Sequence, residues 1–186
     1  MATNDTKLIR PIGDFRKLYC YQKAEAIYDI TYFFVEHFLF RGDRTIDQMK
    51  QAARSVKQNI SEGYSRLATS QESALKLIDV AKASSKELLD DYGDYLRTRN
   101  HRRWERGSVE WSKMQELGRC HNDSAFFMNI VQTRPPETIA NMTMCLIEQN
   151  DYLIANLLDK ISERFIKEGG FRERMTKMRL ENKNKK

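Results

Sequence analysis

The most informative segment of the chain is QMKQAARSVKQNISEGYSR, residues 48–66. Its apolar positions recur at spacings of four, three and four, which places them on one face of a helix: Met49, Ala53, Val56 and Ile60. Small or short side chains lie beside that face, at Ala52, Ser55, Asn59 and Gly63. Because small side chains let two helix axes come close, we expect a tight helix–helix contact that buries the polar groups of Asn59 and Glu62.

The sequence on either side of this segment continues in long helical stretches. The chain has 186 residues, of which 40% are hydrophobic and 31% charged, with 8 glycines and 3 prolines. That length suits one domain with a sizeable core, and so few helix breakers favour long helices. Thr69 is expected to cap a helix in a capping box with Glu72. The apolar spacing predicts helices at about residues 15–40, 45–65, 70–99, 109–133, 136–167 and 171–180, and no strand.

The predicted fold class is all-α: an up-down antiparallel four-helix bundle with an extra helical segment and a C-terminal helical suffix. The expected organisation is a flexible lead-in at residues 1–14, a bundle at 15–170 with an inserted helical segment at 107–134, and a basic suffix and tail at 171–186. The first helix is apolar on two sides, one including Val35 and the other Phe34. Such a helix is buried on both sides, so its second side requires a partner subunit or a cover.

The net charge of +6 is unevenly distributed. Residues 97–106 contain five arginines and one glutamate, and residues 172–186 contain seven basic and two acidic residues. Either segment can contact phosphate, and Trp104 lies within the first segment for stacking. The candidate nucleic-acid-binding residues are Arg97, Arg99, Arg102, Arg103, Arg106, Arg172, Arg174, Lys177 and Arg179. The alternative is a solvated helix end, where basic residues complement the helix dipole, and a tail that only aids solubility.

No group of residues has the pattern of a catalytic, metal or cofactor site. His37, His101 and His121 are isolated, and the sequence has no nucleotide-binding glycine loop and no Gly-x-Ser-x-Gly elbow. We therefore expect no enzymatic activity, no cofactor and no metal.

Two carboxylates, Glu62 and Glu87, are available as an acid–base pair. The favoured interpretation is structural: one of them pairs with Arg54 or Arg66 in a buried contact that fixes helix register. The predicted packing or interface residues are Ala52, Ser55, Asn59, Glu62, Gly63, Arg66 and Glu87.

The cysteines and the N-terminus indicate a cytoplasmic location. Cys20, Cys120 and Cys145 are far apart and odd in number, which fits a reducing compartment. No apolar signal core and no membrane-spanning run is present, so we expect no membrane partner.

Residues 48–66 also resemble a signature, Gln-x-x-Arg-Ala-Ala-x-Ser-Val-x-x-Asn-Ile-x-Glu-Gly-x-x-Arg, of the bacterial four-helix-bundle proteins encoded in intervening sequences of 23S ribosomal RNA genes. The matching positions are Gln48, Ala52, Ala53, Ser55, Val56, Asn59, Ile60, Glu62, Gly63 and Arg66, whereas Gln51 stands where the family usually carries arginine. Residues 81–88, AKASSKEL, resemble the family's Ala-Arg-Gly-Ser-x-x-Glu-Leu, and residues 168–174, EGGFRER, resemble a suffix-containing subgroup. The resemblance covers most of residues 15–175.

This resemblance implies a bundle that assembles as a homo-oligomeric ring, pentameric in family members. One relative, the accessory variability protein of diversity-generating retroelements, partners a reverse transcriptase and its RNA. The first functional hypothesis is therefore a non-enzymatic oligomer that binds structured RNA or DNA, or that assists a nucleic-acid-processing protein. The second is a protein–protein adaptor or scaffold without a nucleic-acid role, which the two-sided first helix and the suffix favour.

Overall fold

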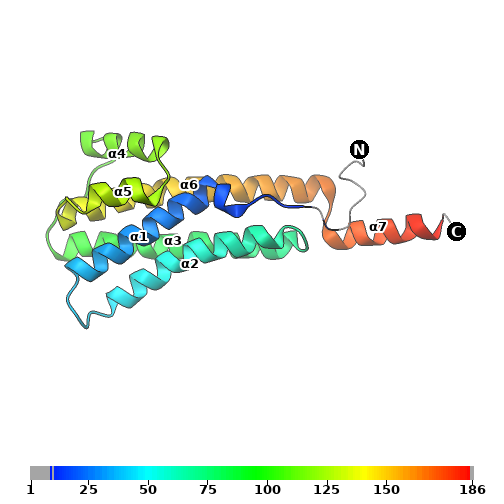
Figure 1. Cartoon of the computed structure of the whole chain (residues 1–186), viewed down its shortest axis with the longest axis horizontal. Helices are drawn as coiled ribbons and strands as arrows, with labels where there is room; N and C mark the ends of the chain where they lie inside the picture. The colour runs from blue at the N-terminus through cyan, green and yellow to red at the C-terminus, as the bar shows by residue number, and fades with distance from the viewer. Residues whose placement is uncertain (1–8, 10, 185–186) are drawn as a thin grey trace.

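The computed structural model (Figure 1) describes residue 9 and residues 11–184. Its described part consists of helices and connecting turns without any strand, which confirms the predicted all-α class. The elements are a short 3₁₀ turn, η2 (Phe15–Lys17), and the helices α1 (Tyr19–Phe38), α2 (Thr45–Arg66), α3 (Gln71–Thr98), α4 (Val109–Cys120), α5 (Ser124–Val131), α6 (Pro136–Glu168) and α7 (Phe171–Lys183). Most of the predicted lead-in, residues 1–8 and 10, and the last two residues of the suffix lie outside the described residues.

Four long helices form the body of the molecule. α1 packs against α2 and α6, and α3 packs against the same two helices. Apolar side chains between them form two buried clusters, one around Phe34 and Leu146 and the other around Ile60 and Ile154. Figure 1 shows α4 and α5 stacked at one end of these helices and α7 projecting beyond the other end.

The position of α2 depends on its apolar face and on one glycine. The four apolar residues of the face are at most 2% exposed: Met49, Ala53, Val56 and Ile60. A Cβ atom on Gly63 would lie 2.7 Å from Cγ1 of Ile78 and 3.1 Å from the carbonyl oxygen of Ala74 on α3. The absence of a side chain at Gly63 therefore lets α2 and α3 approach closely at this point.

The two polar residues of the same segment that were expected to be buried, Asn59 and Glu62, are not fully buried. Glu62 is exposed, and its carboxylate accepts a hydrogen bond of 3.0 Å from the Gln58 side chain one turn earlier. Asn59 is half-buried. The prediction that a contact within the chain buries Glu62 is wrong, because Glu62 precedes Gly63 by one position and so points about 100° away from the buried direction of Gly63.

The predicted buried ion pair is absent as well. Glu87 on α3 and Arg66 at the end of α2 are both exposed. The ion pairs formed between described residues join neither Glu62 nor Glu87 to Arg54 or Arg66. Of the remaining segment residues, Ala52 is buried and Ser55 is half-buried. Small residues therefore fill the helix contact, and charged ones face outward.

The second apolar side of α1 is covered by the same chain. α5 packs on α1, and Phe127 and Val131 of α5 join the cluster that contains Phe34. The cover that the sequence required is thus provided by the inserted segment, and a partner subunit is not needed for that purpose. Tyr19 and Tyr32 of α1 remain 64% and 49% exposed.

Two helix starts, those of α5 and α3, differ from the prediction because of the residues that cap them. The inserted segment breaks at residues 121–123, and Asp123 caps α5 by accepting the Phe126 N–H at 2.8 Å. At the start of α3 the cap is Ser70, whose hydroxyl oxygen accepts the Ser73 N–H at 3.2 Å. The predicted capping box from Thr69 is wrong, because Glu72 forms an ion pair of 2.7 Å with Lys76 instead of reaching back.

Candidate functional site

The arginine-rich segment at residues 97–106 is hydrogen-bonded to the first turns of α6. The side chain of Asn141 accepts a hydrogen bond from the Trp104 backbone N–H at 2.7 Å and donates one to the Arg102 carbonyl oxygen at 2.9 Å. The Arg102 N–H donates to the carboxylate of Glu137 at 3.2 Å. Trp104 is half-buried against the larger apolar cluster. Part of the indole surface predicted for base stacking is therefore already occupied by packing.

The fold pairs most arginines of this segment with carboxylates. Ion pairs join Arg97 to Asp94 (2.8 Å), Arg102 to Glu110 (3.8 Å), and both Arg103 (3.7 Å) and Arg106 (3.3 Å) to Glu148. The guanidinium of Arg99 lies 4.2 Å from the ring centroid of Tyr95. The arginine side chains are exposed, so each pair is weak in energy, but each carboxylate, including that of the half-buried Glu148, cancels positive charge locally. The segment is strongly basic in sequence and much less so on the folded surface.

The basic residues of α7 are arranged differently. Arg172, Thr176, Arg179 and Lys183 follow one another at spacings of four, three and four, so they form one exposed stripe. Lys177 is exposed beside it, whereas Arg174 is half-buried and donates to the Gly169 carbonyl oxygen at 3.3 Å. None of Arg172, Lys177, Arg179 and Lys183 forms an ion pair with another described residue.

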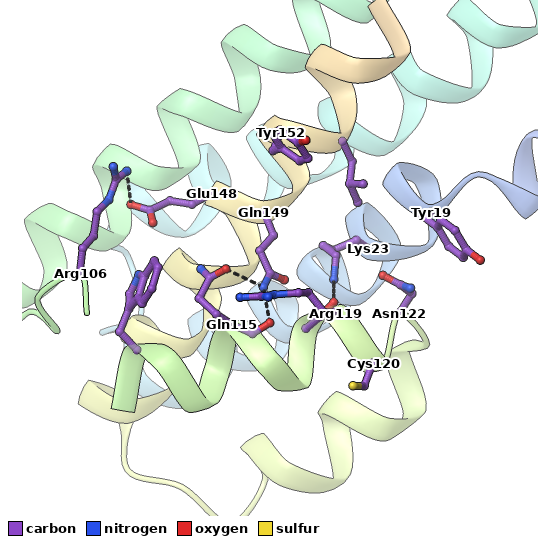
Figure 2. Close-up of a pocket in the computed structure, with 13 residues that line it drawn as sticks. Tyr19, Lys23, Arg106, Gln115, Arg119, Cys120, Asn122, Glu148, Gln149 and Tyr152 are labelled. Atoms are coloured by element: carbon purple, nitrogen blue, oxygen red, sulfur yellow. Dashed lines mark hydrogen bonds and ion pairs between the residues drawn. The ribbon is translucent and has the colours of Figure 1, made fainter. Parts of the chain in front are cut away.

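A cavity of about 760 Å³ lies between α1, α4 and α6 (Figure 2). Its apolar walls include Trp111, Tyr152 and Leu153. Its charged lining consists of three basic side chains and one carboxylate, namely Lys23, Arg106, Arg119 and Glu148. Figure 2 shows Arg106 already directed at Glu148, the carboxylate that Arg103 also contacts.

Lys23 is the unusual member of this lining. Its side chain comes from the buried side of α1 and is only 1% exposed. The ammonium donates a hydrogen bond of 2.6 Å to the carbonyl oxygen of Gly118 near the C-terminal end of α4 (Figure 2). Its nitrogen lies 6.0 Å from the ring centroid of Phe127. Burial lowers the pKa of Lys23 to about 8, because the charged form loses its hydration.

The wall formed by α4 and α6 is closely packed. Gln149 of α6 donates through Nε2 to the backbone oxygen of Gln115 at 2.8 Å and to its side-chain oxygen at 2.9 Å. A Cβ on Gly118 would fall 2.0 Å from Oε1 of Gln149, so α4 approaches α6 through this glycine. Oε1 of Gln149 and Nε1 of Trp111 are buried without a hydrogen-bond partner among the described residues.

Lys23 was not predicted as a site residue, because charged residues were counted along the sequence and were not assigned to helix faces. Cys20, Ala24 and Ile27 surround Lys23 at helical spacing, and all three are buried. A lysine in the middle of such a face is a detectable signal, since unpaired lysines are rarely fully buried. What remained unpredictable was the partner, because Gly118 lies 95 positions further along the chain.

Comparison with family models, with curated proteins and with solved structures finds no match to this chain. Among the described residues, no helix is long and apolar enough to cross a membrane, and no three His, Cys, Asp or Glu side chains are grouped so that they could hold a metal ion. The fold and its surfaces define an all-helical protein with a basic C-terminal helix and a separate cavity that contains a buried lysine.

Proposed function

We propose that the protein is a non-enzymatic helical-bundle protein of the cytoplasm that binds structured nucleic acid, RNA in the first place, through the exposed stripe of α7. In this proposal α1, α2, α3 and α6 form an up-down antiparallel four-helix bundle, α4 and α5 are its inserted segment, and the bundles assemble into the homo-oligomeric ring, of five subunits, that the family resemblance implies. The single observation that carries the nucleic-acid role is the stripe of Arg172, Arg179 and Lys183, which forms no direct ion pair with another described residue, although Arg172 lies close enough to Glu72 of α3 to lower the pKa of that carboxylate.

The choice of α7 over residues 97–106 follows from charge compensation. A cation that already contacts a carboxylate must lose that contact, or share it, when it binds phosphate. Arg103 and Arg106 share Glu148 in direct ion pairs, whereas Arg172 of the stripe acts on Glu72 only at longer range, and Glu72 is itself paired with Lys76. Phosphate contacts also release counterions, which makes binding strongest where positive charge is least neutralised by the protein itself.

The test is a titration of the full chain with a short RNA hairpin, and with a DNA duplex of equal length, at two salt concentrations. Three phosphate contacts predict an affinity loss of roughly 20- to 40-fold between 50 and 200 mM salt. Exchanging Arg172, Arg179 and Lys183 for glutamine should abolish most of the binding and flatten this dependence.

Two control variants make that result specific. Exchanging the exposed lysines Lys82 and Lys86 of α3 and Lys113 of α4 for glutamine removes the same charge, and should leave most of the affinity. Exchanging Arg102 and Arg103 for glutamine tests the other basic segment. Weak binding whose affinity does not change with salt, or a loss of affinity only in the Arg102 and Arg103 variant, would contradict the proposed role of α7.

A second candidate function is that of a protein–protein adaptor. An open groove of about 450 Å³ between α1 and α5 includes three aromatic side chains in its lining, the exposed Tyr32 and the half-buried Tyr28 and Phe33. Aromatic residues are enriched at protein interfaces. Native mass spectrometry of the purified protein, combined with affinity capture from nuclease-treated extract, separates the two functions. A defined protein partner that persists after nuclease treatment, without any affinity for RNA, would favour the adaptor.

A further inference from the structure

We propose that the cavity between α1, α4 and α6 binds a small organic carboxylate with an aromatic or aliphatic body, and that the ammonium of Lys23 is its counter-ion. This inference is independent of the nucleic-acid role, since it concerns a different surface and other residues. The cavity volume of about 760 Å³ falls within the range of about 300–1,000 Å³ that is typical of small-molecule sites.

Lys23 has no counter-charge in its contacts with other described residues, which are the Gly118 carbonyl oxygen and the Phe127 ring. Buried ammonium groups are normally paired with a carboxylate, because an isolated charge loses its hydration on burial. The hydrogen-bond partner of Lys23 is instead a neutral carbonyl oxygen, that of Gly118, helped only by the partial negative charge at the end of α4. The carboxylate of the cavity lining, Glu148, is already shared by Arg103 and Arg106. The lowered pKa of Lys23, for which desolvation is the cause, agrees with the absence of a pairing carboxylate.

The walls of the cavity combine apolar surface with a free polar group. Trp111, Tyr152 and Leu153 provide apolar surface for the body of a ligand. Nε1 of Trp111, a donor that suits a carboxylate oxygen, is buried on a lining residue without a partner among the described residues. Apolar walls with a few polar groups of defined position are the usual make-up of a ligand site.

The charge balance selects a monoanion. Of the other basic groups in the lining, Arg106 is committed to Glu148, and Arg119 is exposed, so its interactions are screened by solvent. One desolvated positive charge thus remains to be matched, which suits a carboxylate. A phosphate dianion would bring a second negative charge that no desolvated cation in the lining balances.

The experiment compares two probes with similar bodies, 3-phenylpropionate and the uncharged 3-phenyl-1-propanol, by calorimetric titration of the full chain. We expect the carboxylate to bind at least ten times more tightly than the alcohol. Lys23→Met, which replaces the ammonium by an uncharged side chain one atom shorter, should abolish this difference, whereas Lys113→Met on the exposed face of α4 should preserve it.

A second measurement does not depend on any variant. In the wild-type protein, 3-phenylpropionate should shift the backbone amide NMR signals of Lys23, Gly118, Gln149 and Tyr152, and should leave those of α7 unchanged. Equal affinity for the two probes, no saturable binding of the carboxylate in the millimolar range, retention of the difference in a folded Lys23→Met variant, or shifts confined to other surfaces would each overturn the proposal.

Discussion

Lys23 illustrates how one buried charge affects the stability of the whole chain. Its pKa in the folded protein is lowered to about 8 by burial, whereas the unfolded chain titrates near the ordinary value of about 10.4. Between these two values the unfolded state binds more protons than the folded state, so the free energy of unfolding increases as the pH rises. Below pH 8 the ammonium is charged in both states and its burial is fully destabilising.

The variant Lys23→Met should remove this pH dependence. We expect the unfolding free energy of the wild type, measured relative to the variant by urea denaturation, to rise by about 2 kcal/mol between pH 7 and pH 10. Comparison with the variant cancels the contributions of buried thiols and tyrosines, which titrate in the same range. A difference that stays constant with pH would show that Lys23 is hydrated in the folded state. Lys113→Met, which changes an exposed lysine, should show no such slope.

The three cysteines should differ sharply in reactivity. Burial raises the pKa of Cys20 to about 11 and that of Cys145 to about 12, so both thiols stay protonated and inaccessible near neutral pH. Cys120 is exposed at the end of α4. We expect iodoacetamide to modify Cys120 in the native protein and the other two only after denaturation, as read by peptide mass spectrometry. Rapid native labelling of Cys145 would indicate that α6 separates from its neighbours.

At the scale of the helix, replacing either of two interior glycines by alanine is expected to change stability in opposite directions. Gly63→Ala should destabilise the protein by about 1 kcal/mol or more, because overpacking against Ile78 and the Ala74 carbonyl exceeds the gain in helix propensity. Gly93 is the matched control: its added Cβ would meet only Cε of Met144, at 3.8 Å. Gly93→Ala should therefore stabilise by about 0.5–1 kcal/mol. Thermal denaturation of both variants tests the pair, and stabilisation by Gly63→Ala would contradict a close α2–α3 approach.

The helices themselves were largely predictable from sequence. Apolar spacing placed α2, α3 and α6 within a few residues of their observed bounds, because each is long and buries a continuous stripe. The start of α1 was predicted too early, since Leu18 adopts an extended conformation with φ −74° and ψ 126° that separates η2 from α1. A single extended residue of this kind depends on how the 3₁₀ turn packs in the folded protein, and it does not alter the spacing of apolar residues in the sequence.

The candidate sites were predictable only in part, because their electrostatics depend on distant residues. Arg106 meets Glu148 across 42 positions, and Asn141 secures Trp104 across 37. A linear charge count therefore overstates the positive charge on residues 97–106. Glu62 is a second example: it was expected to be buried because its neighbour Gly63 is part of the helix contact, but one position along the helix is enough to turn its side chain toward solvent. The sites in α7 and at Lys23 can be identified only when the residues that share a helix face, and the elements packed against that face, are known.

At the scale of the whole molecule, α7 lies largely outside the body, which it meets where Arg174 lines a small cavity together with Tyr64, Gln71 and Ile161. Neither apolar cluster includes a residue of α7, and Figure 1 shows this helix projecting beyond the end of the long helices. If the stripe on α7 is the phosphate-binding surface, removal of residues 171–186 should leave the body folded while eliminating salt-dependent RNA binding. We expect the melting temperature to change by no more than about 2 °C, since a shift of that size corresponds to about 0.5–1 kcal/mol for a domain of this length. Calorimetry and RNA titration of the truncated chain provide both measurements. Truncation that unfolds the helices would show that α7 is part of the core, and truncation that leaves RNA affinity intact would move the binding surface back to the body of the protein.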